Sequence, residues 1–403
     1  MNKCSTTKQN LTAFGSLKLL IFLFIISSFS LNAQVNHIVP GADQPENYLS
    51  LLQNKNVALV INQTSNVNDQ SLADFLLSKK INVKLIFAPE HGFRGDADGG
   101  ATIKNSVDTK TGLPIVSIYG SNRKPLPEQL SGIDMVIFDI QDVGCRFYTY
   151  ISSLHYVMEA CAENKIKLLI LDRPNPNGDY CDGPVLKPEF RSFVGTDPIP
   201  VVHGCTVGEL AQMINGEGWL KNGVKADLQV IPVKNYTHAM KYELPVKPSP
   251  NLPNYQSDRL YPSLCCFEAT SVSVGRGTEF PFQVLGYPDP KFGKFSFTPV
   301  SIVGTETNPM HKNVKCYGED LRNLEKVPQF TLSFFMGWYQ KFPDEKNFIK
   351  SERRFNLLIG NDLVLKLIRE GKTEKEIRQS WQSELNAYKE MRKKYLIYPE
   401  ERL

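Results

Sequence analysis

The chain has 403 residues, a formal net charge of +4, 41% apolar residues and 22% charged residues. This length suits two domains, and the composition is that of a globular protein with a sizeable core. The charge is too small, and the basic residues are too scattered, to indicate a nucleic-acid partner.

The N-terminus has the pattern of a secretory signal peptide. Three lysines precede a short apolar run over residues 19–26, and small residues then lead to Ala33. We expect cleavage after Ala33, so that residues 1–33 form the signal. The apolar run is much shorter than the about 20 residues that span a bilayer, and no later run is long enough. The sequence therefore predicts a periplasmic or secreted protein without stable membrane insertion, with an uncleaved anchor as the alternative.

Eight cysteines are present, and Cys4 would leave with the signal. The remaining seven are an odd number, which implies at least one free thiol in an oxidising compartment. None has the spacing of a redox or zinc motif, so we expect most of them to be small buried side chains.

Residues 34–233 alternate between short apolar runs and helix patterns. Continuous runs of this kind are typical of parallel strands that are covered on both faces. Helices are expected over residues 150–163 and from a capping box at Thr206 and Glu209. This alternation predicts a Rossmann-like α/β domain with a doubly wound parallel sheet. The expected strands are residues 57–61, 83–87, 114–118, 135–140, 167–171 and 228–233.

The pattern changes at about residue 234, where prolines become frequent and strands irregular. Near the end, a capping box over residues 373–376 precedes Ile377, Trp381, Leu385 and Tyr388, which share one stripe of a helix. We expect a single packed amphipathic helix there, with the basic residues 392–394 at its end. Residues 234–403 are therefore predicted to form a smaller α+β domain.

Polar residues follow several of the predicted strands. In an open parallel sheet, ligands bind outside the carboxyl ends of the strands. The candidate binding residues selected by this rule are Asn62, Arg94, Asp142 and Arg146, together with Glu90 and His91.

Several chemistries can be excluded by their missing motifs. The first strand lacks a G-x-G-x-x-G turn, and no nucleophile elbow, H-E-x-x-H helix or P-loop occurs. His91, Asp96 and Asp98 could in principle hold a metal, but no second histidine lies nearby. We therefore expect neither a cofactor nor a metal, and an esterase or amidase is disfavoured.

Carboxylate chemistry remains. Glycoside hydrolysis needs a proton donor and a second group that attacks or stabilises. Glu90 follows an apolar segment that could desolvate it, which makes it the best proton donor, and His91 could orient it. A structural bridge from Glu90 to Arg94 is the alternative. Glu268, in the second domain, is the natural second carboxylate, with a structural pair to Arg276 as its alternative.

Five segments, in order along the chain, resemble one family. They are residues 89–95, 139–150, 171–176, 275–278 and 395–398, and together they are similar to the NamZ-type exo-β-N-acetylmuramidases. The resemblance implies a Rossmann-like domain and a C-terminal domain with the active site in the cleft between them. It also implies release of N-acetylmuramic acid from the non-reducing end of peptidoglycan fragments.

The resemblance assigns roles to individual residues. Glu90 matches the catalytic glutamate, with His91, Arg94, Asp142 and Tyr148 nearby, whereas Ala269 and Val274 depart from the family pattern. Arg94, Arg146 and Arg276 could bind the lactyl carboxylate of the sugar. Tyr148 offers a flat surface for a sugar ring or, alternatively, packs in the core. Retaining, inverting and substrate-assisted mechanisms stay open, and a non-catalytic binding protein for cell-wall sugar is the alternative function.

Overall fold

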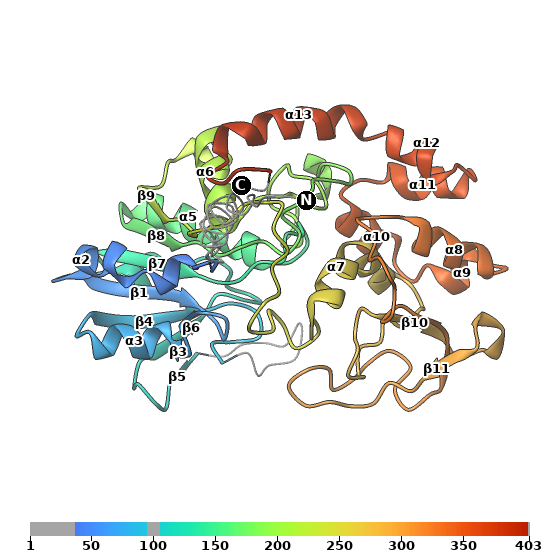
Figure 1. Cartoon of the computed structure of the whole chain (residues 1–403), viewed down its shortest axis with the longest axis horizontal. Coiled ribbons are helices and arrows are strands. Elements are labelled where there is room, and N and C mark those ends of the chain that lie inside the picture. The colour runs from blue at the N-terminus through green and yellow to red at the C-terminus, as the bar shows by residue number, and fades with distance from the viewer. Residues whose placement is uncertain (1–36, 95–104, 402–403) are drawn as a thin grey trace, which may run out of the picture. The chain divides into compact units, whose positions relative to one another are not determined.

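A computed structural model describes residues 37–94 and 105–401 (Figure 1). The predicted signal peptide and the segment with Asp96 and Asp98 lie outside the described residues. From Ile38 onward the chain forms one compact unit. Among the described residues, no helix has the length and apolar character needed to cross a membrane.

A seven-stranded sheet forms the first part of the chain, in the order β5-β6-β4-β1-β7-β8-β9. All six expected strands are present and pair in parallel. The chain winds outward from β1 in both directions, which confirms the doubly wound arrangement. The strands are β1 (Asn56–Ile61), β4 (Asn82–Ala88), β5 (Ser106–Val107), β6 (Pro114–Ser117), β7 (Met135–Asp139), β8 (Lys167–Leu171) and β9 (Leu228–Ile231).

The sheet differs from the prediction at one edge. Strand β5 pairs antiparallel with β6, so the sheet is mixed and not wholly parallel. Both residues of β5 are exposed, and the strand is too short to produce an apolar run. Its sequence therefore carries no strand pattern, and pairing with β6 alone defines it.

Both faces of the sheet are buried, as the continuous apolar strands require. Along β1, Ala58 and Val60 face one apolar core, whereas Val57, Leu59 and Ile61 face the other. The first core includes α5 (Tyr150–Asn164) and α6 (Val207–Glu217), and the second includes α2 (Leu49–Leu52) and α3 (Leu72–Ser78). A short α4 (Pro127–Leu130) and a hairpin of β2 (Asn66–Val67) and β3 (Gln70–Ser71) complete this part.

The second part of the chain combines a small antiparallel sheet with helices, as predicted for an α+β domain. The sheet has the order β10-β12-β11, and the aromatic core of the helices is continuous with one core of the large sheet. The strands are β10 (Val284–Tyr287), β11 (Phe295–Phe297) and β12 (Cys316–Asp320). The helices are α7 (Tyr255–Leu264), α8 (Ser333–Lys341), α9 (Glu345–Phe348), α10 (Glu352–Ile359), α11 (Leu363–Arg369), α12 (Glu374–Gln379) and α13 (Gln382–Arg392).

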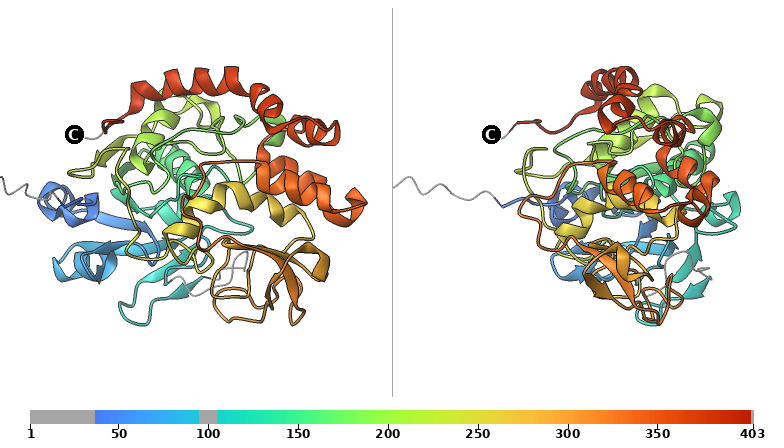
Figure 2. Two further views of the ribbon diagram at one scale, coloured as in Figure 1. Left: turned by 45° about the vertical axis from the view of Figure 1, so that its right-hand side comes forward. Right: turned by 90° about the vertical axis from the view of Figure 1, so that its right-hand side faces the viewer.

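The prediction of one closing helix is wrong, because α12 and α13 are separate. At Trp381 the backbone has φ −112° and ψ −1°, away from helical values of about −63° and −42°. Ile377, Trp381, Leu385 and Tyr388 are all buried nevertheless, so the stripe is correct although the helix is interrupted. Helix α13 lies along the top of Figure 1 and of both views in Figure 2.

Short 3-10 helices connect these elements. They are η1 (Gly41–Asp43), η2 (Pro45–Asn47), η3 (Pro188–Phe190), η4 (Lys221–Gly223), η5 (Cys265–Ala269), η6 (Pro290–Phe292) and η7 (Lys393–Tyr395). The helix η5 carries Glu268 and therefore contributes directly to the site described below.

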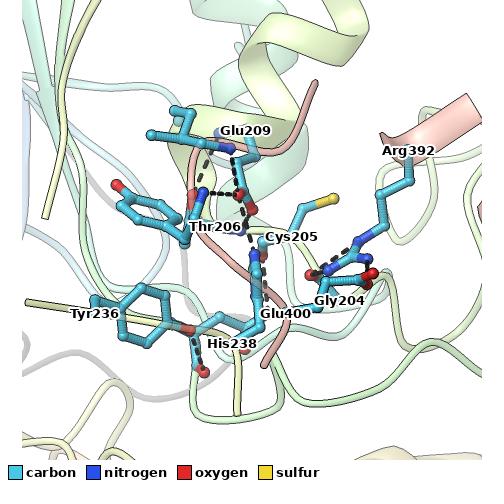
Figure 3. Close-up of polar contacts among 12 residues, drawn as sticks. Gly204, Cys205, Thr206, Glu209, Tyr236, His238, Arg392 and Glu400 are labelled. Carbon is cyan, nitrogen blue, oxygen red and sulfur yellow. Dashed lines mark hydrogen bonds and ion pairs between the residues drawn. The ribbon is translucent and has the colours of Figure 1, made fainter. Parts of the chain in front are cut away.

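Buried polar contacts attach the C-terminal segment to the start of α6 (Figure 3). The expected capping box is present, because Glu209 accepts a hydrogen bond from the Thr206 amide at 2.9 Å. The other carboxylate oxygen of Glu209 accepts from the Ile397 amide at 2.9 Å and contacts His238 Nε2 at 3.0 Å. Arg392 lies in the last turn of α13, at the helix end where the sequence places it. Its side chain donates to Gly204 O at 3.1 Å.

The seven cysteines of the described residues are free and buried, as the sequence predicts. Burial raises the pKa of each thiol. The thiols are therefore neutral at physiological pH and serve as small packing groups.

Candidate active site

A cavity of about 380 Å³ lies at the carboxyl ends of the parallel strands. The large sheet contributes residues that follow β4, β6 and β7, and the second part of the chain contributes residues from Ser249, in the loop before α7, onward. The cavity is lined by Glu90, His91, Tyr119, Phe147, Tyr148, Thr149, Ser249, Asn251, Leu252, Tyr261, Glu268, Arg276, Phe282, Glu306 and Arg354. Five of the sequence-predicted residues meet here: Glu90, His91, Tyr148, Glu268 and Arg276.

Glu90 lies two residues after β4, and hydroxyl groups hold both of its carboxylate oxygens. Tyr119 donates to Oε1 at 2.9 Å, and Thr149 donates to Oε2 at 2.7 Å. Burial raises the pKa of Tyr119, and the charge of Glu90 raises it further. The phenol therefore keeps its proton and acts as a donor. Two donors from different strand ends fix the plane of the carboxylate within the cavity.

His91 is buried beside Glu90 in a tight turn. Its φ of 68° and the φ of 78° at Gly92 are both left-handed, and the Gly92 amide donates to Pro89 O at 3.0 Å. A left-handed histidine is uncommon, and such backbone conformations cluster at functional sites. The turn places both Glu90 and His91 on the cavity wall.

Glu268 is held between two arginines. Its Oε1 accepts from Arg276 Nη2 at 2.6 Å, and its Oε2 accepts from Arg354 Nη2 at 2.8 Å. Burial alone would raise the pKa of Glu268, but the charges and hydrogen bonds of Arg276 and Arg354 lower it below its ordinary value. Glu268 is therefore ionised at neutral pH with both oxygens occupied, which suits an ion pair and not a proton donor. This arrangement is the structural pair that the sequence left as the alternative.

The lowered pKa of Glu268 predicts how its contribution to stability depends on pH. Because the folded-state pKa lies below the ordinary value of 4.5, ionised Glu268 stabilises the fold above that pH, and this contribution is lost as pH falls through the lowered pKa. We expect Glu268→Gln to reduce the free energy of unfolding at neutral pH. The reduction should be smaller at acidic pH. Urea unfolding of both proteins at neutral and acidic pH measures this difference. An equal cost at both pH values would contradict the prediction.

Two of the predicted arginines do not line the cavity. The Arg94 side chain is 41% exposed and pairs with Asp108 at 2.8 Å. Arg146 is fully buried, and its guanidinium donates to three backbone carbonyls. Because the side chain is fully buried, a substrate carboxylate in the cavity could reach Arg146 only if the core opened. Arg146 follows a strand, so the strand-end rule selected it, but its side chain points into the core.

Asn62 and Asp142 also lie outside the cavity lining, because local turns use their side chains. Asn62 Oδ1 accepts from the Thr64 amide at 2.9 Å and shapes the turn after β1. Asp142 accepts from the Gly144 amide at 2.6 Å and lies 3.3 Å from His203 Nε2. Both residues shape the loops behind the cavity, and the structure does not bring them to the substrate space.

Tyr148 lines the cavity and also packs in the core. Its hydroxyl donates to Pro248 O at 2.8 Å. Its ring makes edge contacts with Tyr150 and Tyr261, with ring centroids 4.9 and 5.9 Å away. The ring is therefore packed in the core, as one interpretation expects, and it also forms part of the cavity wall.

Sequence reasoning missed Tyr119, Thr149 and Arg354. Tyr119 directly follows the third predicted strand, so the strand-end rule could have found it. Thr149 lies within a quoted motif, beside residues that were selected. Arg354 lies far along the chain on the amphipathic helix α10, and no local pattern marks it. In the described ranges, no group of His, Cys, Asp and Glu side chains is arranged to hold a metal ion.

Comparisons with known proteins agree over nearly the whole chain. The family model for the N-terminal part of the exo-β-N-acetylmuramidase NamZ matches residues 57–256, and that for its C-terminal part matches residues 259–398. The peptidoglycan β-N-acetylmuramidase NamZ of Bacillus subtilis (strain 168) is 38% identical over 379 residues, which cover 87% of this chain and 89% of the relative.

Two crystal structures of DUF1343 family proteins from Bacteroides fragilis NCTC 9343 share the fold. BF0379 has a TM-score of 0.83 and 45% identity, and BF0371 has a TM-score of 0.77 and 28% identity. Each match covers 90% of this chain and 99% of the other chain.

Proposed function

Because the chain belongs to the NamZ family of exo-β-N-acetylmuramidases, we propose that it is a glycosidase acting on peptidoglycan fragments. It releases N-acetylmuramic acid from the non-reducing end by cleaving the β-1,4 bond to N-acetylglucosamine. The observation that carries this proposal is the cavity in which Tyr119 and Thr149 orient the carboxylate of Glu90.

Glu90 is the general acid and base in this proposal. A glycosidase acid must protonate the leaving oxygen, and its carboxyl group must be held in one orientation to do so. The two hydroxyl donors provide that orientation. Glu90 remains partly exposed on the cavity wall, so a bound sugar can reach it.

The cavity wall also includes arginine side chains that suit this substrate. N-acetylmuramic acid differs from N-acetylglucosamine by a lactyl group with a carboxylate. Arg276 lines the cavity and can form charge-assisted hydrogen bonds to such a group.

The test is a comparison of two chromogenic substrates. We expect the purified protein to cleave a β-N-acetylmuramide and to leave the matching β-N-acetylglucosaminide intact. Cleavage of neither substrate would contradict the proposed activity. Binding of N-acetylmuramic acid without cleavage would support the non-catalytic binding protein instead.

We also propose that the protein is exported. The basic, apolar and small-residue pattern of residues 1–33 supports this. N-terminal sequencing of protein recovered from the periplasm or the medium would show a start at Gln34. A chain recovered only from the cytoplasm, with its first residues intact, would contradict it.

Tyr119→Phe tests how Glu90 is oriented. Phenylalanine keeps the ring but removes the hydroxyl that donates to Glu90 Oε1. A hydrogen bond to a charged group contributes about 1.5–3 kcal/mol, so we expect kcat to fall about 10- to 100-fold with little change in KM. Steady-state kinetics on the muramide measure both constants. A rise in KM at constant kcat would instead give Tyr119 a role in substrate binding.

A further inference from the structure

The ion pairs with Glu268 occupy only part of the hydrogen-bond donors of Arg276 and Arg354. Arg276 and Arg354 each give one terminal nitrogen to Glu268, at 2.6 and 2.8 Å. A guanidinium has five N–H donors in a planar fork. Both side chains line the cavity and are partly exposed, at 26% for Arg276 and 42% for Arg354. Donors of both arginines are therefore available to a bound molecule.

The charges of this group are not balanced at Arg354. Glu306 lies 3.9 Å from Arg276 Nη1, so Arg276 shares its charge with two carboxylates. Among the described residues, Glu268 is the carboxylate that pairs with Arg354. Arg276 thus has two carboxylate neighbours and Arg354 has one, so the guanidinium of Arg354 is the less neutralised of the two.

Arg354 also lies close to the proposed acid. Burial and Glu90 raise the pKa of Tyr119, whereas the positive charges of Arg123 and Arg354 act in the opposite direction. Glu90, Tyr119 and Arg354 all line the same cavity. An anion bound by Arg354 would therefore lie in the cavity in which Glu90 protonates the leaving oxygen.

Both the backbone and the guanidinium of Arg354 are held in place by hydrogen bonds. Its amide donates to Ser351 Oγ at 3.1 Å, which is the N-cap bond of α10. Its guanidinium is fixed by Glu268. An arginine fixed in this way loses less side-chain entropy when it binds a ligand.

We propose that Arg354, paired with Arg276 and positioned by Glu268, is the residue that selects an anionic sugar by binding its lactyl carboxylate. Glu268 is then a positioning residue and not the second catalytic carboxylate. This inference rests on the proposed function, because that function supplies the sugar. Arg354 takes the role that the sequence assigned to Arg94 and Arg146.

The test compares a chromogenic β-N-acetylmuramide with its lactyl methyl ester, which lacks the negative charge. The parent protein should prefer the acid. We expect Arg354→Ala to lower kcat/KM for the acid about 10- to 100-fold, mainly through KM, and to leave the ester unchanged. Arg353→Ala removes an exposed charge from the same helix and should leave kcat/KM unchanged for both substrates. An equal loss on both substrates, or no loss, would overturn the assignment.

Glu268→Gln separates positioning from catalysis. As a positioning residue, Glu268 should affect KM for the acid more than kcat, and the ester should be cleaved at nearly the parental rate. A large and equal fall in kcat on both substrates would make Glu268 a catalytic residue and overturn this part of the inference.

A binding measurement keeps the inference testable if the protein cleaves neither substrate. Calorimetry would compare free N-acetylmuramic acid with N-acetylglucosamine on the parent and on Arg354→Gln, with thermal unfolding as a check of folding. Tighter binding of the acidic sugar that is lost in the variant would support the assignment. Equal binding of both sugars by the parent would reject it, independently of any activity.

Discussion

Glu90→Gln is expected to lower kcat on a chromogenic muramide by about 10²- to 10⁴-fold, the usual contribution of a general acid or base. Glutamine has nearly the same size and can still accept a hydrogen bond from Tyr119 or Thr149, but it cannot transfer a proton. Substrate binding should therefore persist with KM almost unchanged. Steady-state kinetics and calorimetric binding of N-acetylmuramic acid measure the two effects separately.

A matched control separates this effect from the loss of a negative charge near the cavity. Glu279 is exposed, lies beside the Gly275–Thr278 turn and does not line the cavity. Glu279→Gln should keep the parental kcat. If Glu90→Gln retained full turnover, the acid would have to be another residue, and the orientation by Tyr119 and Thr149 would have no catalytic purpose.

The large sheet could be predicted because each strand carries its own signal. Strands buried on both faces need apolar residues at every position, so β1, β7 and β8 are visible as continuous runs. Strand β5 carries no such signal, because its two residues are exposed. The break between α12 and α13 was also invisible, since Trp381 keeps the apolar stripe while its backbone leaves the helix.

The site could be predicted only where the sequence order determines it. Glu90 and His91 follow a strand, and parallel strands end at one edge of the sheet, so their position follows from topology. Arg354 reaches the same cavity from α10 by tertiary packing, which no local pattern encodes. Arg146 shows the opposite case, because a strand-end position does not determine where a side chain points.

The buried position of Arg146 leads to the second large expected effect, a loss of stability in Arg146→Ala. Its Nη1 donates to Pro184 O at 2.8 Å and to Ile199 O at 2.9 Å, and its Nη2 donates to Leu358 O at 2.8 Å. Burial lowers its pKa to about 9, so it stays charged at neutral pH. The side chain thereby joins the loop after β7 to the last turn of α10.

Removing Arg146 leaves three buried carbonyls without this donor and opens a cavity. An unpaired buried polar group costs about 1–3 kcal/mol, whereas removing a buried charge recovers part of its desolvation cost. We expect Arg146→Ala to lower the free energy of unfolding by about 3–5 kcal/mol in urea at neutral pH. Arg191→Ala removes an exposed arginine and should change the free energy of unfolding by less than about 0.5 kcal/mol.

The same substitution should weaken the site from a distance. Leu358 and Arg354 share α10, so loss of the bond from Arg146 loosens the helix that carries the proposed carboxylate-binding residue. The folded fraction of Arg146→Ala should therefore show a raised KM for the acidic muramide and a kcat close to that of the parent. Unfolding at the parental urea concentration would show that other donors replace Arg146, and the structural assignment of this arginine would then fail.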